Sequence, residues 1–129
     1  MVRGKVVIDT SIIIDHLRLP RKEKSPFEMI VENGNLESLI STATIQELFI
    51  GQSSLREDQE TKIRRIINLI HNLNVSPEIA ELAGQIMRDT KPQVQFADAA
   101  IAATAILNKA KLLTLNKKDF KGIQGLKLI

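Results

Sequence analysis

Short β-branched runs alternate along the chain with stretches whose apolar residues recur every three or four positions. The short runs predict strands at 5–8, 36–41, 74–76 and 112–115, with 126–129 as a short fifth candidate. Helical spacing and capping signals predict helices at 12–18, 26–33, 44–51, 57–73, 77–90 and 97–107. This order predicts an α/β fold with a mostly parallel central sheet of four to five strands, flanked by helices.

The longest of these stretches shows helical spacing most clearly. Its apolar residues, which form one stripe of an amphipathic helix, are Ile63, Ile66, Ile67, Ile70 and Leu73. His71 falls in the same stretch and is assigned to its polar face, while His16 is assigned to the protein surface. Met87 and the isoleucine stripes are expected in the core or in a dimer interface.

Length and composition predict one compact domain over residues 1–129. The chain has 129 residues, 43% of them hydrophobic, and its polar segment at 19–26 is too short to separate two domains. No apolar run is long enough to span a membrane, and no signal peptide precedes the first strand. A soluble, cytoplasmic protein is therefore expected.

The residue types that are missing exclude several kinds of chemistry. The chain has no cysteine and two histidines, which excludes disulfides, thiolate metal sites and a histidine-based zinc site. Aromatic residues make up 3% of the chain, which disfavours binding by base stacking. No glycine-rich nucleotide-binding motif is present. The net charge of +3 permits attraction to phosphates without requiring it.

Four acidic residues stand at predicted helix starts or turns, and each has a local structural explanation. Asp9 is placed to cap the first helix, and Asp98 lies in a first turn, where the helix dipole favours a negative charge. Glu47 stands at capping-box spacing from Thr44, and Asp119 lies in a similar cap-like sequence. Considered one at a time, Glu47 and Asp119 are best explained as structural.

Considered together, these acids predict a metal site. Turns that follow parallel strands meet at one edge of the sheet, so their carboxylates should converge and repel one another unless a cation is bound. Carboxylate and amide oxygens suit Mg²⁺ or Mn²⁺. Such an ion activates a water and stabilises charge on a phosphoryl oxygen, so phosphodiester hydrolysis is the matching reaction.

Four stretches resemble the motifs of PIN-domain ribonucleases, in the family's order and spacing. They are residues 7–11 (VIDTS), 44–51 (TIQELFIG), 96–105 (FADAAIAATA) and 113–120 (LTLNKKDF). One such motif would be weak evidence, but four in register over nearly the whole chain are jointly specific. The length also resembles that of VapC-type toxins from type II toxin–antitoxin systems.

This resemblance implies a PIN-like three-layer fold and a Mg²⁺-dependent endoribonuclease that cleaves RNA. It also implies a small VapB-like antitoxin as partner, and a homodimer. The metal-binding and catalytic acids it implies are Asp9, Glu47 and Asp98, with Asp119 as a further catalytic acid. The residues assigned to orienting or supporting positions are Thr10, Ser11, Thr114 and Asn116.

The fourth motif departs from the family, because Asn116 stands where many PIN domains carry an acid. The last ligand position is either neutral or supplied by Asp119, which should weaken a second metal site more than the first. Lys117 and Lys118 are candidates for phosphate contact, although surface solubility explains them equally well. Four further basic residues could follow the RNA backbone beside the first helix, but a solvated loop is the favoured interpretation: Arg18, Arg21, Lys22 and Lys24.

Other functions remain as alternatives. A PIN-type nuclease of RNA processing would share the acids but have no antitoxin. A non-catalytic PIN scaffold is supported only by the neutral Asn116. A phosphoacceptor domain normally needs paired acids after the first strand, where this chain has Asp9 followed by Thr10 and Ser11.

Overall fold

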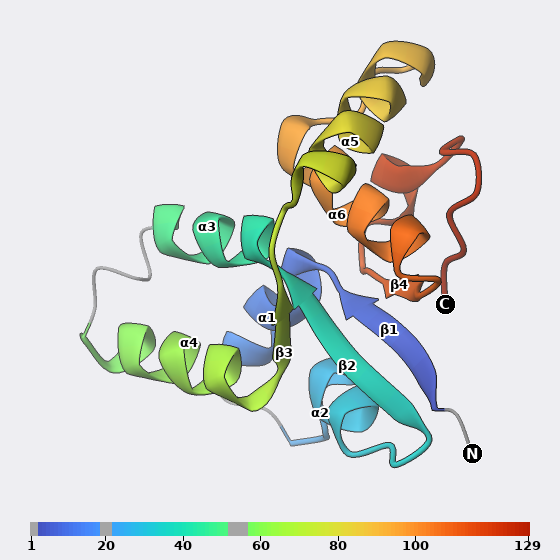
Figure 1. Ribbon diagram of the computed structural model, residues 1–129. Helices are drawn as coiled ribbons and strands as arrows, with labels where there is room; N and C mark the ends of the chain where they lie inside the picture. Colours follow the sequence, from blue (N-terminus) through green and yellow to red (C-terminus); the bar gives the residue numbers. More distant parts are fainter. Residues whose placement is uncertain (1–2, 19–21, 52–56) are drawn as a thin grey trace.

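The computed structural model describes residues 3–18, 22–51 and 57–129, which form a parallel sheet covered by helices (Figure 1). The strands are β1 (Gly4–Ile8), β2 (Leu36–Ser41), β3 (His71–Leu73) and β4 (Lys111–Leu113), in the order β3-β2-β1-β4. All three strand pairs are parallel, and Val7 of the central β1 lies opposite Leu39 and Leu112. The predicted parallel α/β fold is confirmed.

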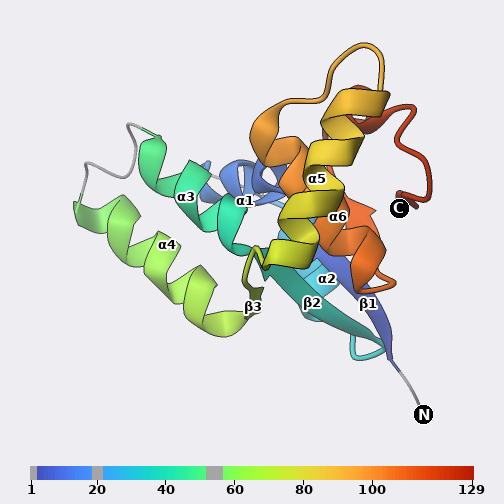
Figure 2. The ribbon, with the colours of Figure 1, turned by 45° about the horizontal axis from the view of Figure 1, so that its top comes forward.

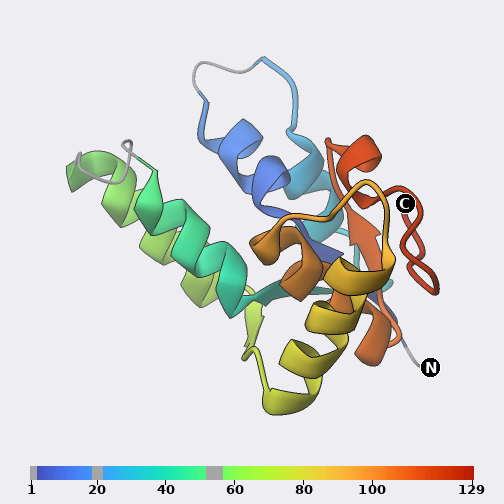
Figure 3. The ribbon, with the colours of Figure 1, turned by 90° about the horizontal axis from the view of Figure 1, so that it is seen from above.

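The helices cover both faces of the sheet, as Figures 2 and 3 show. They are α1 (Thr10–Leu17), α2 (Pro26–Val31), α3 (Thr42–Ile50), α4 (Glu57–Leu69), α5 (Pro77–Asp89) and α6 (Phe96–Leu107). Successive strand residues point to opposite faces. Val6 and Ile8 pack with α1, α2 and α4, while Val7 packs with α5 and α6. The alternation in β1 therefore supplies both halves of the core, in three layers.

Helix α6 lies against the sheet with a face of small side chains. Its buried alanines include Ala99, Ala102, Ala103 and Ala105, each with no exposed surface. Small side chains let the helix axis approach the strands and α5 closely. This packing holds the first turn of α6, which carries Asp98, at a defined place beside β1.

The third strand differs from the prediction. It begins at His71, three residues before the expected strand at 74–76, and α4 ends at Leu69 instead of residue 73. The Asn72 amide donates to the backbone carbonyls of Ile67 and Ile70, which satisfies groups that the end of the helix leaves open. His71 is therefore an exposed strand residue, and its assignment to a helix face was wrong.

The other boundaries shift by smaller amounts. Helix α1 begins at Thr10, helix α2 ends at Val31, and helix α3 begins at Thr42. The fifth strand expected at 126–129 is reduced to an isolated bridge between Leu112 and Leu128. No helix in the ranges that the structure describes has the length and apolar character needed to cross a membrane.

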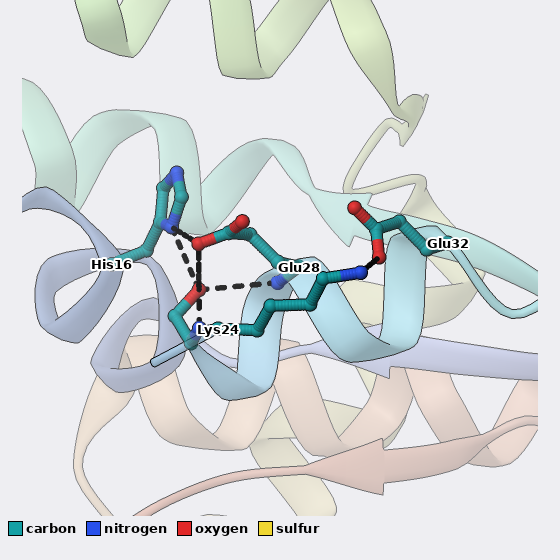
Figure 4. Close-up of polar contacts among 5 residues, drawn as sticks. His16, Lys24, Glu28 and Glu32 are labelled. Atoms are coloured by element: carbon teal, nitrogen blue, oxygen red, sulfur yellow. Dashed lines mark hydrogen bonds and ion pairs between the residues drawn. The ribbon is translucent and has the colours of Figure 1, made fainter. Parts of the chain in front are cut away.

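His16 is half-buried between α1 and α2, so its assignment to the surface was wrong (Figure 4). Its Nδ1 lies 2.7 Å from Oγ of Ser25, and its ring packs on Phe27 at a centroid distance of 4.7 Å. Ser25 is fully buried and forms a capping box with Glu28 at the start of α2. The cluster of His16, Ser25, Phe27 and Glu28 thus joins the end of α1 to the start of α2.

Candidate metal-dependent active site

The candidate site lies at the carboxyl ends of the two strands β1 and β4. From β1 the chain proceeds to β2 on one side, while β4 adds to β1 on the other side. Asp9 follows β1, and Thr114 follows β4. Such a switch in strand order is where parallel α/β folds bind their ligands.

Asp9 is 3% exposed and is held by hydroxyl groups from two segments. Its Oδ2 accepts hydrogen bonds from Oγ of Ser11 and from Oγ1 of Thr114, both at 2.7 Å. The same oxygen accepts a longer bond of 3.4 Å from the backbone N–H of Ser11, so Asp9 also caps α1 as expected. Within the described part of the chain, its Oδ1 accepts no side-chain hydrogen bond.

The two hydroxyls that bind Asp9 are themselves oriented by backbone groups. The N–H of Leu115 donates to Oγ of Ser11 at 3.1 Å, and the N–H of Asn116 donates to Oγ1 of Thr114 at 2.9 Å. Because each hydroxyl has one proton, accepting a backbone bond directs that proton to Asp9. The segment after β4 therefore holds the acid that follows β1.

Glu47 projects from α3 towards the same place. Oγ1 of Thr10 donates to its Oε1 at 2.6 Å, and lies 3.1 Å from Oγ1 of Thr44. The capping-box explanation of Glu47 was wrong, because Ser41 caps α3 through the N–H of Ala43. Glu47 therefore lies beyond the first turn, where its side chain reaches α1.

Asp98 occupies the first turn of α6, as predicted, and faces the other acids. Burial, together with the negative charges of Asp9, Glu47 and Asp119, raises the pKa of its carboxyl to about 6. A raised pKa means that the charged form is disfavoured, both by loss of water and by like charge. The acids from four segments thus come close enough to interact electrostatically.

The acids share a pocket of about 320 Å³, which we call the acid pocket. Its lining residues are Asp9, Thr10, Ser11, Ile14, Asp15, Arg18, Glu47, Asp98, Leu115 and Asn116. In the chain outside 1–2, 19–21 and 52–56, no three His, Cys, Asp or Glu side chains form a group that could hold a metal ion on their own. A magnesium ion does not need such a cage, because it keeps several waters and takes one or two carboxylates. The oxygen donors of the pocket fit a hard, partly hydrated ion of this kind.

Asp119 and the two lysines of the fourth motif do not line the acid pocket. Asp119 and Lys118 line a neighbouring pocket that also includes Asp98, while Lys117 is exposed and lines neither. Asn116, in contrast, does line the acid pocket. Of the two candidates for the last ligand position, Asn116 therefore lies in the acid pocket and Asp119 lies in the neighbouring one.

The sequence analysis missed two residues at this site, Thr44 and Asp15, and favoured a solvated loop over an RNA contact for Arg18. Asp15 and Arg18 follow Ser11 at four and seven positions along α1, a spacing that could have placed them on its active face. Arg18 is the exposed residue that follows α1, as a solvated position predicts, and it also lines the acid pocket. Lys22 and Lys24 line a separate pocket between α1, α2 and α4, and Arg21 lies outside the described residues.

Comparison with known proteins identifies the fold family. The family model described as "PIN domain" matches residues 6–126. The chain belongs to the PIN-domain family. The three-layer PIN fold that the four motifs implied is confirmed.

Relatives of this PIN domain include named ribonucleases. Ribonuclease VapC1 of Rickettsia felis is 33% identical, over 96% of this chain and 94% of the relative. Ribonuclease VapC1 of Methanocaldococcus jannaschii is 30% identical, over 97% of this chain and 87% of the relative. A solved toxin–antitoxin complex from Klebsiella pneumoniae matches with a TM-score of 0.74 and 30% identity, covering 94% of both chains. The expected relation to VapC-type proteins is confirmed.

Proposed function

We propose that this PIN domain is a metal-dependent endoribonuclease and the toxin of a toxin–antitoxin pair. The observation that carries the proposal is the shared pocket of Asp9, Glu47 and Asp98 in a chain whose relatives are named ribonucleases. The raised pKa of Asp98 supports it, because burial and the neighbouring negative charges disfavour the ionised carboxyl, and a bound cation would offset those charges.

Nucleases of this family in general depend on a metal ion, and we propose Mg²⁺ here, with Mn²⁺ as a substitute. Asp9, Glu47 and Asp98 would hold it. A bound ion would offset their charges and stabilise negative charge on the phosphoryl oxygen of the substrate. Asn116 lines the same pocket and would be a neutral ligand. Asp119 does not line this pocket, and its negative charge contributes by raising the pKa of Asp98.

The chain's own residues have defined tasks in this reaction. Ser11 and Thr114 hold Asp9 in one orientation, and Thr10 does the same for Glu47. Neither histidine lines the acid pocket, so we assign the orientation of the attacking water to one of its carboxylates. Arg18 lines the pocket as its one cationic side chain and would attract the RNA backbone.

The decisive experiment compares RNA cleavage by the wild type and by Asp98→Asn, with Mg²⁺ and with a chelator. We expect cleavage by the wild type in Mg²⁺, and a loss of about 100-fold or more in the variant or in chelator. Asp89→Asn is the matched control, because Asp89 is an exposed acid at the end of α5 that pairs with Arg88. Equal cleavage by the wild type and Asp98→Asn, or full activity in chelator, would remove the proposed mechanism.

A small VapB-like antitoxin is the partner we propose, and a homodimer the assembly. The Klebsiella relative was solved as a toxin–antitoxin complex, which supports such a partner for this chain. Growth arrest on expression, relieved by Asp9→Asn and by co-expression of a small neighbouring gene, is the expected result. Cleavage in vitro without growth arrest would favour a role in RNA processing.

A further inference from the structure

A second pocket adjoins the acid pocket on the other side of Asp98. It has a volume of about 490 Å³, and we call it the lysine pocket. It is lined by Lys91, Pro92, Gln93, Val94, Gln95, Asp98, Lys118, Asp119, Lys121 and Gly122. Asp98 is the residue that the two pockets share, so a ligand that passes over Asp98 would enter both.

The two pockets differ in the sign of their charged side chains. The acid pocket has four carboxylates, from Asp9, Asp15, Glu47 and Asp98, and one guanidinium, from Arg18. The lysine pocket has three ammonium groups against the carboxylates of Asp98 and Asp119. A polymer with repeated negative charges, lying across Asp98, would thus contact the acid pocket and its metal on one side and the lysine ammonium groups on the other.

The three lysines have no partner in the described parts of the chain. Lys91, Lys118 and Lys121 form no ion pair or hydrogen bond through their side chains with another described residue. Their ammonium groups are therefore available to a ligand. Elsewhere the protein does pair such groups, for example Lys24 with Glu32 (Figure 4).

The backbone that carries these lysines is anchored in the core. Lys91 follows α5, while Lys118 and Lys121 belong to the 3-10 helix η2 (Lys117–Phe120) and its C-cap. Figure 3 shows the segment after α5 passing close to the red C-terminal turn. Val94, Phe120 and Ile123 are each less than 7% exposed and lie in the core beneath these segments. The backbone positions that carry the three lysines are therefore fixed by packing.

We propose that the lysine pocket binds the backbone phosphate next to the scissile phosphate of a single-stranded RNA. This inference rests on the ribonuclease function proposed above, because the scissile phosphate must lie in the acid pocket. Successive phosphates of one strand are close neighbours, and Asp98 is the common wall between the pockets. Lysine binds phosphate as a point charge, which suits contact with a strand of any sequence.

The test is the salt dependence of RNA binding by Lys118→Gln/Lys121→Gln. Binding of a short, fluorescently labelled single-stranded RNA is measured in chelator, so that the RNA stays intact, between about 50 and 200 mM salt. Loss of this one phosphate contact should reduce the slope of log Kd against log salt by about 0.7, and weaken binding about 5-fold near 0.1 M salt. In Mg²⁺, KM should rise by a similar factor while kcat stays within about threefold, because the contact holds substrate and transition state alike.

Lys111→Gln is the matched control, since Lys111 is exposed at the opposite, amino end of β4. It should leave the slope, Kd and KM unchanged, and thermal melting checks that all variants fold. An unchanged slope and Kd in the double variant would overturn the lysine pocket and leave the nuclease function standing if the wild type cleaves RNA. Weakened antitoxin binding with unchanged RNA binding would overturn it in favour of an acidic protein segment. A wild type that neither binds nor cleaves RNA would overturn both proposals.

Discussion

Asp98 is the residue whose charge the folded protein disfavours most clearly. Burial and three neighbouring carboxylates raise its pKa to about 6, from an ordinary value of 3.8. The folded state therefore binds this proton more tightly than the unfolded state does. The stability that protonation contributes is present below about pH 4 and is lost as the pH rises through 6.

We therefore predict that Asp98→Asn changes the pH dependence of stability in the absence of metal. Between about pH 4 and 7, the free energy of unfolding of the wild type should fall by about 1–2 kcal/mol relative to the variant, a value reduced for the solvent around this half-buried carboxyl. Urea unfolding at several pH values in chelator measures the difference. Parallel pH curves for the two proteins would contradict the repulsion among the acids.

The hydroxyl of Thr114, which follows β4, connects this strand to Asp9 at the end of β1. It donates to Asp9 and accepts from the N–H of Asn116, so Thr114→Val leaves the acid with one hydroxyl donor fewer. We expect RNA cleavage, or the affinity for Mg²⁺, to fall by about 10- to 100-fold, as for other groups that orient metal ligands. Cleavage assays over a range of Mg²⁺ concentrations measure this. Thr61→Val, on the exposed side of α4, serves as the control.

At the scale of elements, polar contacts at helix ends decide how neighbouring helices meet. The connection between α1 and α2 depends on Ser25, which caps α2 through the N–H of Glu28 and also contacts His16. Ser76 caps α5 through the N–H of Ile79, and no other described group shares that contact. The two serines thus have the same local task, and differ in their tertiary contact.

Ser25→Ala should destabilise the protein more than Ser76→Ala. Loss of a cap costs about 1 kcal/mol, and loss of the hydrogen bond to His16 adds about 1 kcal/mol at Ser25. The difference between the two free energies of unfolding, measured with urea, isolates the link between α1 and α2. Equal losses would mean that His16 contributes nothing to stability.

At the scale of the whole molecule, the site depends on four segments meeting at one edge of the sheet. Strands β1 and β4 bring Asp9 and Thr114 together, while α3 and α6 bring Glu47 and Asp98 from either face. A metal ion bound there would join both layers of helices to the sheet. Metal binding should therefore be linked to global stability.

Mg²⁺ should raise the stability of the wild type at neutral pH. At about 100 times its Kd, the ion should add about 2.7 kcal/mol to the free energy of unfolding. Thermal or urea unfolding with Mg²⁺ and with chelator measures the gain, which Asp9→Asn should abolish and Asp89→Asn should preserve. A gain that persists in Asp9→Asn would place the ion elsewhere.

Local patterns in the sequence determined the elements and the family. The β-branched run of β1, caps at Asp9, Ser25 and Ser76, and alanine in α6 act within a few residues, so their effects can be predicted without a fold. The four motifs also predicted that acids from distant segments meet. The short strand β3 could not be placed, because the amide of Asn72 ends α4 by a contact that the apolar pattern does not record.

Only the tertiary structure decided which groups hold the acids and on which side of Asp98 each charge lies. The bond between Thr114 and Asp9 joins residues 105 positions apart, and that between Thr10 and Glu47 joins residues 37 apart. Such contacts depend on how the strands pair and how closely the helices pack, which is a property of the whole chain. The separation of Asn116 from Asp119, and the grouping of Lys91 with Lys118, have the same origin.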